Sequence, residues 1–273
     1  MSIIFHLYLC LLSLLLVFQV DNRVYFCGQC FTIGDLVVNC NDRQVVDISV
    51  VGKLTELQEL RLLNTKVTNI SALKSLTKLR RLYLNGSSML SDISPLSNLH
   101  KLDILTMRDT KVNNIGQISK LRNVELLDIS GTNVIDLSAI KEYYRLKKLN
   151  ISRTNVVDIE PLANLVSLKI LLMSGTKITS LSQLKQLRNL EILLLSNCPI
   201  REIGPISRLP KLRTLDISQS PVIDIKKLAE KEGNGVTIVV GKDQLDEATK
   251  NILLNAGYKI EINKTGNHAL LRL

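Results

Sequence analysis

A repeat of 22 residues constrains this chain more than any other feature of its sequence. Eight successive units carry it between Leu54 and Glu230. The unit from Leu165 to Gln186 shows its fixed positions, which are Leu165, Leu168, Leu171, Met173, Thr176, Ile178, Leu181 and Leu184. Self-similarity at a fixed period in this range is the signature of a solenoid, whose coils stack so that each contacts only its neighbours.

Each unit predicts a short strand followed by a helical turn. The units begin at Leu54, Leu76, Leu99, Leu121, Tyr143, Leu165, Leu187 and Leu209. The LxxLxL segment is apolar at alternate positions and indicates a strand, and stacked coils place such strands in parallel about 4.8 Å apart. The second half of each unit, with Pro at its start in several units, has room for little more than a 3-10 turn. We therefore predict an α/β solenoid, an arc with a parallel sheet on its concave face and short 3-10 turns on its convex face.

Sequence outside the repeats predicts terminal caps. The apolar residues 1–20 are typical of a secretory signal peptide, with an uncleaved signal anchor as the alternative. Residues 21–53 are predicted to form an N-terminal cap with a partial first repeat, and residues 54–230 form the eight full repeats. Residues 231–273 are predicted to be a strand–helix–strand cap and a tail, with the helix over Asp243 to Ala256.

Three cysteines of the N-terminal cap allow two interpretations. Cys27, Cys30 and Cys40 stand just before the repeats. Three thiols leave a tetrahedral zinc site incomplete. In an oxidising compartment we expect a disulfide from Cys40 to either Cys27 or Cys30.

The repeat pattern LxxLxLxxTxVxDIxxL resembles that of leucine-rich repeat proteins, in the 22-residue class of bacterial internalins. It is similar also to secreted and surface leucine-rich repeat proteins of parasitic protozoa. The stretch VNCNDRQVVDI resembles the end of the cysteine-rich cap of extracellular members, although one of the usual four cysteines is missing. The resemblance covers roughly residues 36–230. It implies a curved solenoid that recognises a protein or a glycan, with no catalysis and no cofactor.

The chain departs from the family at the ladder position, where many members carry Asn. The residues here are Thr65, Ser87, Thr110, Thr132, Thr154, Thr176, Cys198 and Ser220. Short hydroxyls can both donate and accept hydrogen bonds along a stacked column, so we predict a structural ladder with Cys198 as one of its rungs. A catalytic role for Cys198 would need a nearby base, and His100 lies four coils away.

No sequence motif of an enzyme class is present. The chain has three His and contains no HExxH, GxSxG, P-loop or GxGxxG motif. An evenly spaced column of aspartates fits turn capping better than acid–base chemistry. It consists of Asp47, Asp92, Asp136, Asp158 and Asp224.

The side chains between the fixed positions of LxxLxL should face the concave surface. Ile170, Leu172, Ile192 and Leu194 are predicted to be contiguous there and to form an exposed apolar partner site, with semi-burial as the alternative. We assign Asp216, Tyr83 and Arg108 to the same partner-binding face. This predicts a monomeric, non-catalytic extracellular or surface module that binds a protein or glycan. The alternative is an intracellular scaffold that regulates an enzyme.

Two further surface features concern partners and modification. The net charge of +10 permits an anionic glycan or a membrane surface as a partner, whereas we expect no nucleic acid. A basic stripe is predicted along one edge, from Lys78, Lys101, Arg122, Arg145, Arg188 and Lys211, with a merely solvated edge as the alternative. Sequons for N-glycosylation begin at Asn69, Asn85, Asn150 and Asn263, and we expect a glycan on Asn150 to project from the concave face.

Overall fold

The computed structural model describes residues 22–263 except 208, 231 and 234. The signal peptide or anchor predicted for residues 1–20 therefore lies outside the described residues. The chain divides into two compact units, with the boundary between Val124 and Glu125. Within the described part, no helix is both long enough and apolar enough to cross a membrane.

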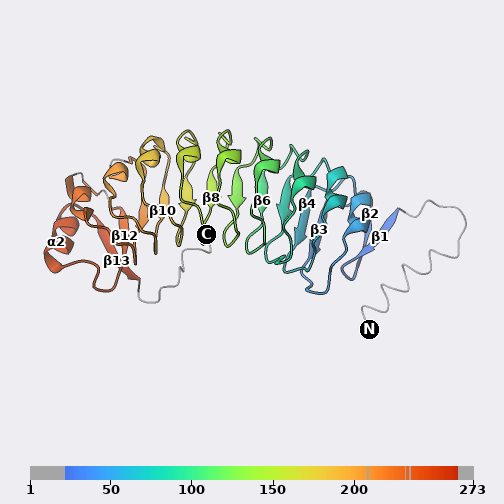
Figure 1. Ribbon diagram of the computed structural model, residues 1–273, viewed down its shortest axis with the longest axis horizontal. Helices are drawn as coiled ribbons and strands as arrows, with labels where there is room; N and C mark the ends of the chain where they lie inside the picture. The colour runs from blue at the N-terminus through green and yellow to red at the C-terminus, as the bar shows by residue number, and fades with distance from the viewer. Residues whose placement is uncertain (1–21, 208, 231, 234, 264–273) are drawn as a thin grey trace, which may run out of the picture. The chain divides into compact units, whose positions relative to one another are not determined.

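The first unit begins with an antiparallel hairpin and continues with four parallel strands (Figure 1). The hairpin pairs β1 (Arg23–Phe26) with β2 (Gln29–Thr32). Its turn is made by Cys27 and Gly28, both at positive φ, the backbone that a two-residue hairpin turn requires. The parallel strands are β3 (Val37–Cys40), β4 (Glu59–Leu62), β5 (Arg81–Tyr83) and β6 (Ile104–Thr106). The 3-10 turns are η2 (Ser49–Lys53), η3 (Ser71–Ser75), η4 (Ser94–Leu96) and η5 (Gly116–Ile118).

The second unit continues the same alternation of strand and turn (Figure 1). Its strands are β7 (Leu126–Asp128), β8 (Lys148–Asn150), β9 (Ile170–Leu172), β10 (Ile192–Leu194), β11 (Thr214–Asp216), β12 (Thr237–Gly241) and β13 (Lys259–Asn263). Consecutive strands from β7 to β13 pair in parallel. The 3-10 turns are η6 (Ser138–Ile140), η7 (Glu160–Leu162), η8 (Ser182–Gln186), η9 (Gly204–Ile206) and η10 (Ile225–Glu230). The helix α2 (Glu247–Asn255) connects the last two strands.

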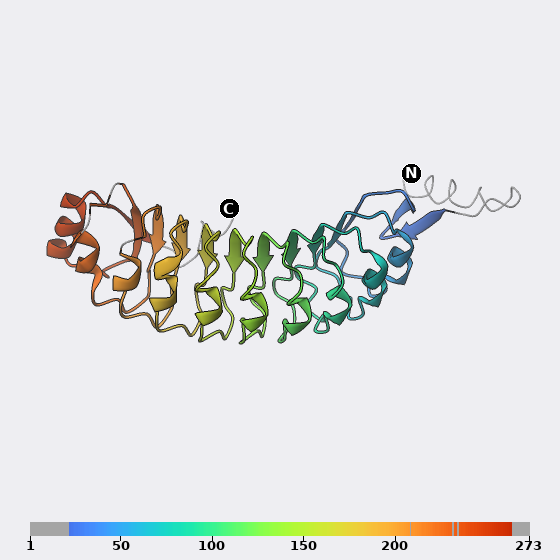
Figure 2. The same cartoon turned by 90° about the horizontal axis from the view of Figure 1, so that it is seen from above.

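Strands line one side of each unit and 3-10 turns the other, with the core between them (Figure 2). The middle residue of each three-residue strand points inward, and Leu149, Leu171 and Leu193 are fully buried in this way. The buried residues repeat from coil to coil, so each aliphatic side chain packs against its equivalents in the neighbouring coils. The predicted α/β solenoid of strands and 3-10 turns is confirmed within each unit.

After each strand from β4 to β11 the chain turns through a residue in the left-handed conformation. These residues are Asn64, Gly86, Asp109, Gly131, Arg153, Gly175, Asn197 and Gln219, one in each coil. Gly takes positive φ at no steric cost, and Asn and Asp tolerate it. Arg153 and Gln219 have no such preference, so these two coils hold a strained backbone that the stacked neighbours enforce.

The C-terminal elements include the two strands and the helix expected from the sequence, but the helix begins later than Asp243. Asp243 has a φ of 61°, which no helix accommodates. Asp246 is the N-cap instead, and its carboxylate accepts a hydrogen bond of 2.6 Å from the backbone N–H of Thr249. The helix therefore starts at Glu247, because its capping side chain rather than its first polar residue sets the boundary.

Candidate functional site

Outward-pointing side chains of the strands form one surface in each unit, which we call the strand face. In the first unit it comprises Val37, Asn39, Glu59, Arg61, Arg81, Tyr83, Ile104 and Thr106. In the second it includes Leu126, Asp128, Lys148, Asn150, Ile170, Leu172, Ile192, Leu194, Thr214 and Asp216. The inward residues of the same strands are aliphatic apart from Cys40, whereas the outward residues differ from coil to coil. Uniform packing needs only the inward set, so the outward set is available to form a site.

The apolar residues predicted on the second strand face are adjacent, but two of them are not exposed. Parallel register pairs Ile170 with Ile192 and Leu172 with Leu194. Ile170 and Ile192 are partly exposed, whereas Leu172 is only 4% exposed and Leu194 is fully buried. The expectation that both leucines project into solvent is therefore wrong. Each leucine has register partners on both adjoining strands, and alternation along one strand says nothing about how closely such neighbours pack.

Polar groups flank this apolar patch. Asp216 is 1% exposed, and its carboxylate accepts hydrogen bonds of 2.9 Å from the backbone N–H and 2.7 Å from the hydroxyl of Ser218. The buried hydroxyls of Ser152 and Ser174 have no hydrogen-bond partner among the described residues. Their oxygens are enclosed by neighbouring atoms, so they are not accessible to a ligand on this surface.

Four outward residues on β4 and β5 form a charged and aromatic group, which we call the Glu59 cluster. It consists of Glu59, Arg61, Arg81 and Tyr83. The carboxylate of Glu59 accepts from Arg61 Nε at 2.6 Å and from Arg81 Nη1 at 2.8 Å. The guanidinium carbon of Arg61 lies 4.8 Å from the centroid of the Tyr83 ring. The hydrogen bond to Glu59 raises the pKa of Arg61.

The sequence pattern identified Tyr83 as a site residue and missed its charged neighbours. Glu59 and Arg81 occupy the same position in successive coils and carry opposite charges. Opposite charges one repeat apart are a signal for a cross-strand ion pair, and it could have been found in the sequence. Arg108, the other residue predicted in the first unit, is exposed, and its Nε lies 3.7 Å from Asp109 Oδ2.

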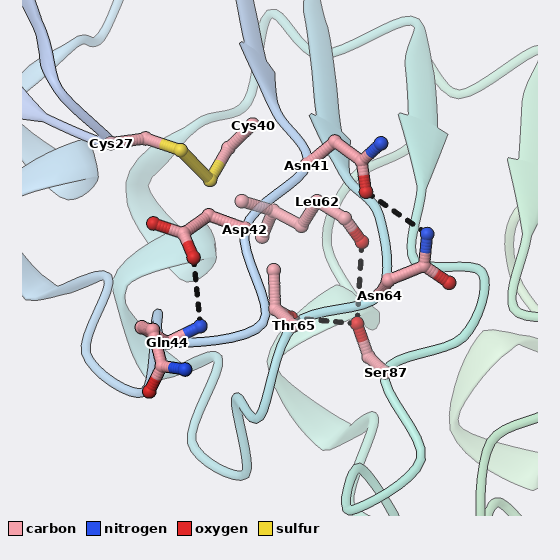
Figure 3. Close-up of a disulfide and its surroundings, with 9 residues drawn as sticks. All are labelled: Cys27, Cys40, Asn41, Asp42, Gln44, Leu62, Asn64, Thr65 and Ser87. Carbon is pink, nitrogen blue, oxygen red and sulfur yellow. Dashed lines mark hydrogen bonds between the residues drawn. A yellow bond between two sulfur atoms is a disulfide. The ribbon is translucent and has the colours of Figure 1, made fainter.

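The ladder column is buried and hydrogen-bonded, as a structural role requires. The hydroxyl of Thr65 lies 2.8 Å from that of Ser87, which also lies 3.2 Å from the carbonyl of Leu62 (Figure 3). In the second unit, the Cys198 thiol donates to the carbonyl of Met173 at 3.1 Å. Burial raises the pKa of the Cys198 thiol, so the nucleophilic thiolate is disfavoured.

Aspartates of the predicted capping column hold the 3-10 turns. Asp47, Asp92 and Asp136 each accept from the backbone N–H two residues ahead at 2.8 Å. These hydrogen bonds lower the pKa of Asp47 and of Asp136. Asp158 makes the same contact with Glu160 N. Asp224 differs, because it accepts from Ile203 N and Gly204 N in the preceding coil.

The disulfide of the N-terminal cap joins Cys27 to Cys40 (Figure 3). It ties the hairpin turn to the end of β3, the first strand of the parallel sheet. Cys30 lies on β2 as a half-buried thiol. Across the described residues, no group of three His, Cys, Asp or Glu side chains is arranged to hold a metal ion.

Among the sequons, Asn150 differs from the prediction. It is only 6% exposed, and its side-chain amide donates to Asp128 Oδ2 at 3.2 Å. The expectation that a glycan projects from this residue is therefore wrong, because the acceptor nitrogen is buried and hydrogen-bonded. Asn69 is exposed, and Asn85 and Asn263 are partly exposed.

Much of the predicted basic stripe is paired with neighbouring polar side chains. In the first unit Lys78 pairs with Glu56. In the second unit Arg145 lies 3.1 Å from Glu125, and Lys211 donates to Asn189 Oδ1 at 2.7 Å. The two ion pairs with glutamates reduce the positive charge that the stripe presents, which favours the interpretation of a solvated edge.

Comparison with known proteins identifies leucine-rich repeats in the chain. The sequence profile described as Leucine Rich repeats (2 copies) matches residues 55–98 and 188–230. No curated protein sequence matches the chain.

Solved structures similar to the chain include two internalins of Listeria monocytogenes. The internalin InlF has 28% identity and a TM-score of 0.69, over 80% of this chain and 66% of its own, so the chain spans slightly less than two thirds of its length. Internalin C2 has 26% identity and a TM-score of 0.67, over 70% of this chain and 86% of its own. A plant peptide hormone receptor, RGFR1 in complex with RGF2, shares the fold at 15% identity and a TM-score of 0.58, over 79% of this chain and 38% of its own.

The 22-residue coils, the matched profile and the two internalin structures lead to one conclusion. The chain contains leucine-rich repeats, and its structure is similar to those of internalins.

Proposed function

We propose that this protein is a non-catalytic extracellular or cell-surface recognition module, which binds a protein partner on the strand face of its second unit. One observation carries the proposal. Ile170 and Ile192 are register partners on β9 and β10, and both remain partly exposed above a layer of buried leucines. Solvent-accessible aliphatic side chains on a rigid sheet are the kind of anchor around which protein interfaces concentrate affinity.

The surroundings of the two isoleucines support a protein ligand. In the parallel register Ile170 lies beside Lys148 and Ile192 beside Thr214, and both of these polar residues are partly exposed. An apolar centre with polar groups around it matches the usual anatomy of an interface. Because the strands are held by their stacked neighbours, the surface is preorganised and little conformational entropy is lost on binding.

Two further observations support the location and the class of protein. The Cys27–Cys40 disulfide is stable in an oxidising compartment, which is consistent with secretion or surface display. Leucine-rich repeat proteins of the internalin type generally mediate protein binding. The absence of a catalytic role is part of the proposal, and the raised pKa of the buried Cys198 thiol supports it.

The test begins with capture of partners from the native environment and their identification, followed by calorimetry with the purified partner. The variant Ile170→Ser/Ile192→Ser removes the apolar anchors without adding charge. We expect it to bind at least about tenfold more weakly, because removal of two anchors costs more than the 1.4 kcal/mol that a factor of ten represents.

The matched control replaces two exposed aliphatic residues elsewhere in the second unit. Val157 is 60% exposed and Ile223 is 72% exposed, and neither belongs to the strand face. Val157→Ser/Ile223→Ser should bind with unchanged affinity. If the Ile170/Ile192 variant is folded and its affinity equals that of the control, this face is not the binding site.

A further inference from the structure

The Glu59 cluster in the first unit pairs two cations with one anion. Parallel register places Glu59 beside Arg81 and Arg61 beside Tyr83, so the four side chains form a compact square on β4 and β5. Glu59 is largely buried, with a side chain 10% exposed. The side chains of Arg61 and Arg81 are 46% and 49% exposed. The cluster therefore presents two accessible guanidinium groups and retains one formal positive charge.

Most hydrogen-bond donors of these arginines are unused. A guanidinium group has five N–H donors in a planar fork. Arg61 donates one hydrogen bond to Glu59 from its Nε, and Arg81 donates one from its Nη1. Among the described residues, the remaining donors of both groups have no partner. A second anion can thus bind both arginines while Glu59 keeps its own contacts.

The cluster is also held in place before any ligand arrives. Glu59 bridges the two arginines, and the Tyr83 ring lies beneath the guanidinium of Arg61 at 4.8 Å. Fixing arginine side chains in advance removes an entropic cost of binding, and a planar fork matches the two oxygens of a carboxylate. The cluster therefore presents two exposed guanidinium groups that Glu59 orients on the strand face.

We propose that the Glu59 cluster is a docking site for an acidic polypeptide segment, whose Asp or Glu carboxylate binds Arg61 and Arg81 together. This inference rests on the proposed function in treating a strand face as protein-binding, but it concerns another unit and other residues. The neighbouring Val37 pairs in register with Glu59 and is 47% exposed. It offers an aliphatic contact beside the anion site, which suits a peptide with acidic and apolar residues in alternation.

Charge distribution favours a peptide over a polyanionic glycan. A sulfated chain needs several unpaired cations in a row, because its affinity comes from repeated charge contacts. Other cations of the first unit near these strands are already paired: Arg80 with Asp103 at 2.8 Å, and Lys78 with Glu56. One anion site next to an apolar residue therefore fits a single carboxylate on a polypeptide.

The experiment uses the full chain and a defined probe, which is a synthetic peptide of alternating Glu and Leu with blocked ends. The control is a peptide of the same length in which Gln replaces every Glu. NMR of the arginine Nε–H groups reports binding without any substitution. We expect the Glu–Leu peptide to shift the Arg61 and Arg81 signals, and higher salt to weaken that shift. The Gln–Leu peptide should leave both signals in place.

Substitution gives a second readout. Removing the arginines alone would leave Glu59 buried without a partner, so the variant is Glu59→Gln/Arg61→Gln/Arg81→Gln. It should bind the Glu–Leu peptide at least about tenfold more weakly, since charge-assisted hydrogen bonds to both arginines are lost. The control Arg188→Gln/Arg201→Gln removes two exposed arginines in the second unit and should bind normally.

Three results would overturn the docking site: absence of the Arg61 and Arg81 shifts in the unsubstituted protein, equal peptide affinity of a folded triple variant, or tighter binding of a sulfated oligosaccharide at the same two arginines. The Ile170→Ser/Ile192→Ser variant should bind the Glu–Leu peptide unchanged. Failure of this site and failure of the proposed function are thus separate outcomes.

Discussion

The hydroxyl of Thr176 lies 3.5 Å from the thiol of Cys198, one coil further along the chain. Both side chains reach the same acceptor, the carbonyl of Met173, at 2.8 Å from Thr176 and 3.1 Å from Cys198. The thiol therefore substitutes for a hydroxyl in a buried column that satisfies backbone groups where each strand ends. This position gives the cysteine a packing and hydrogen-bonding role.

A matched pair of substitutions tests this role. Cys198→Thr restores the residue found at most other rungs and should retain the unfolding midpoint. Valine has nearly the same shape as threonine but no hydrogen-bond donor. Cys198→Val should therefore lower the free energy of unfolding by about 1 kcal/mol, because a buried hydrogen bond is lost. Thermal unfolding by circular dichroism measures both. Equal midpoints would contradict the ladder role, and so would rapid alkylation of Cys198 in the native protein.

Alkaline pH should destabilise the fold through buried neutral groups. Burial raises the pKa of Tyr143. An unfolded tyrosine ionises near pH 10, so the unfolded state loses its proton first and is favoured as pH rises above about 10. Stability should be unaffected by this group below that pH. Urea unfolding between pH 8 and 11 should show a decline, and Tyr143→Phe should reduce the slope of that decline whatever its effect at neutral pH.

Because Leu172 and Leu194 are buried, charged residues at these positions should destabilise the fold of the second unit, and not merely alter its binding surface. Leu172→Glu/Leu194→Glu should lower stability by several kcal/mol, since each carboxylate would have to be desolvated. Loss of secondary structure or a large fall in the midpoint would be seen by circular dichroism. A double variant with the original midpoint would show that both side chains reach solvent.

Substitutions at two equivalent left-handed turn positions, Gly175 and Gln219, should change stability in opposite directions. Gly175 has a φ of 70°, so Gly175→Ala should cost about 1 kcal/mol of backbone strain. Gln219 has a φ of 62° and bears that strain already, so Gln219→Gly should raise the unfolding midpoint slightly. A stabilising Gly175→Ala, or a strongly destabilising Gln219→Gly, would show that the turn can relax.

The two disulfide partners and the remaining thiol of the cap should respond differently to substitution. Cys27→Ser opens the crosslink to Cys40, a sequence separation of 13 residues. Loops of similar length contribute about 3 kcal/mol in the chain-entropy description, so the first unit should unfold at a lower temperature. Cys30→Ser should leave the midpoint nearly unchanged. Mass mapping of the alkylated native protein provides the independent readout, and a Cys30–Cys40 crosslink would contradict the pairing.

Sequence periodicity by itself determined the architecture. Equivalent apolar positions such as Leu149, Leu171 and Leu193 recur every 22 residues, and only a stack of equivalent coils buries all of them at once. The hydroxyl ladder followed for the same reason, since a small polar residue at one fixed position in every coil must meet its counterparts. Adjacency of Ile170 and Ile192 was predictable too, because the repeat length fixes the register.

Only the tertiary structure decided which outward side chains reach solvent and which pair with each other. Leu172, Leu194 and Asn150 lie at outward positions and are nevertheless buried, because exposure depends on the side chains packed around them from coils a full repeat away. The choice of Cys27 over Cys30 depended on where the hairpin turn places each thiol relative to β3. A repeat specifies the positions of residues on a face, whereas exposure and pairing arise from the particular side chains that meet there.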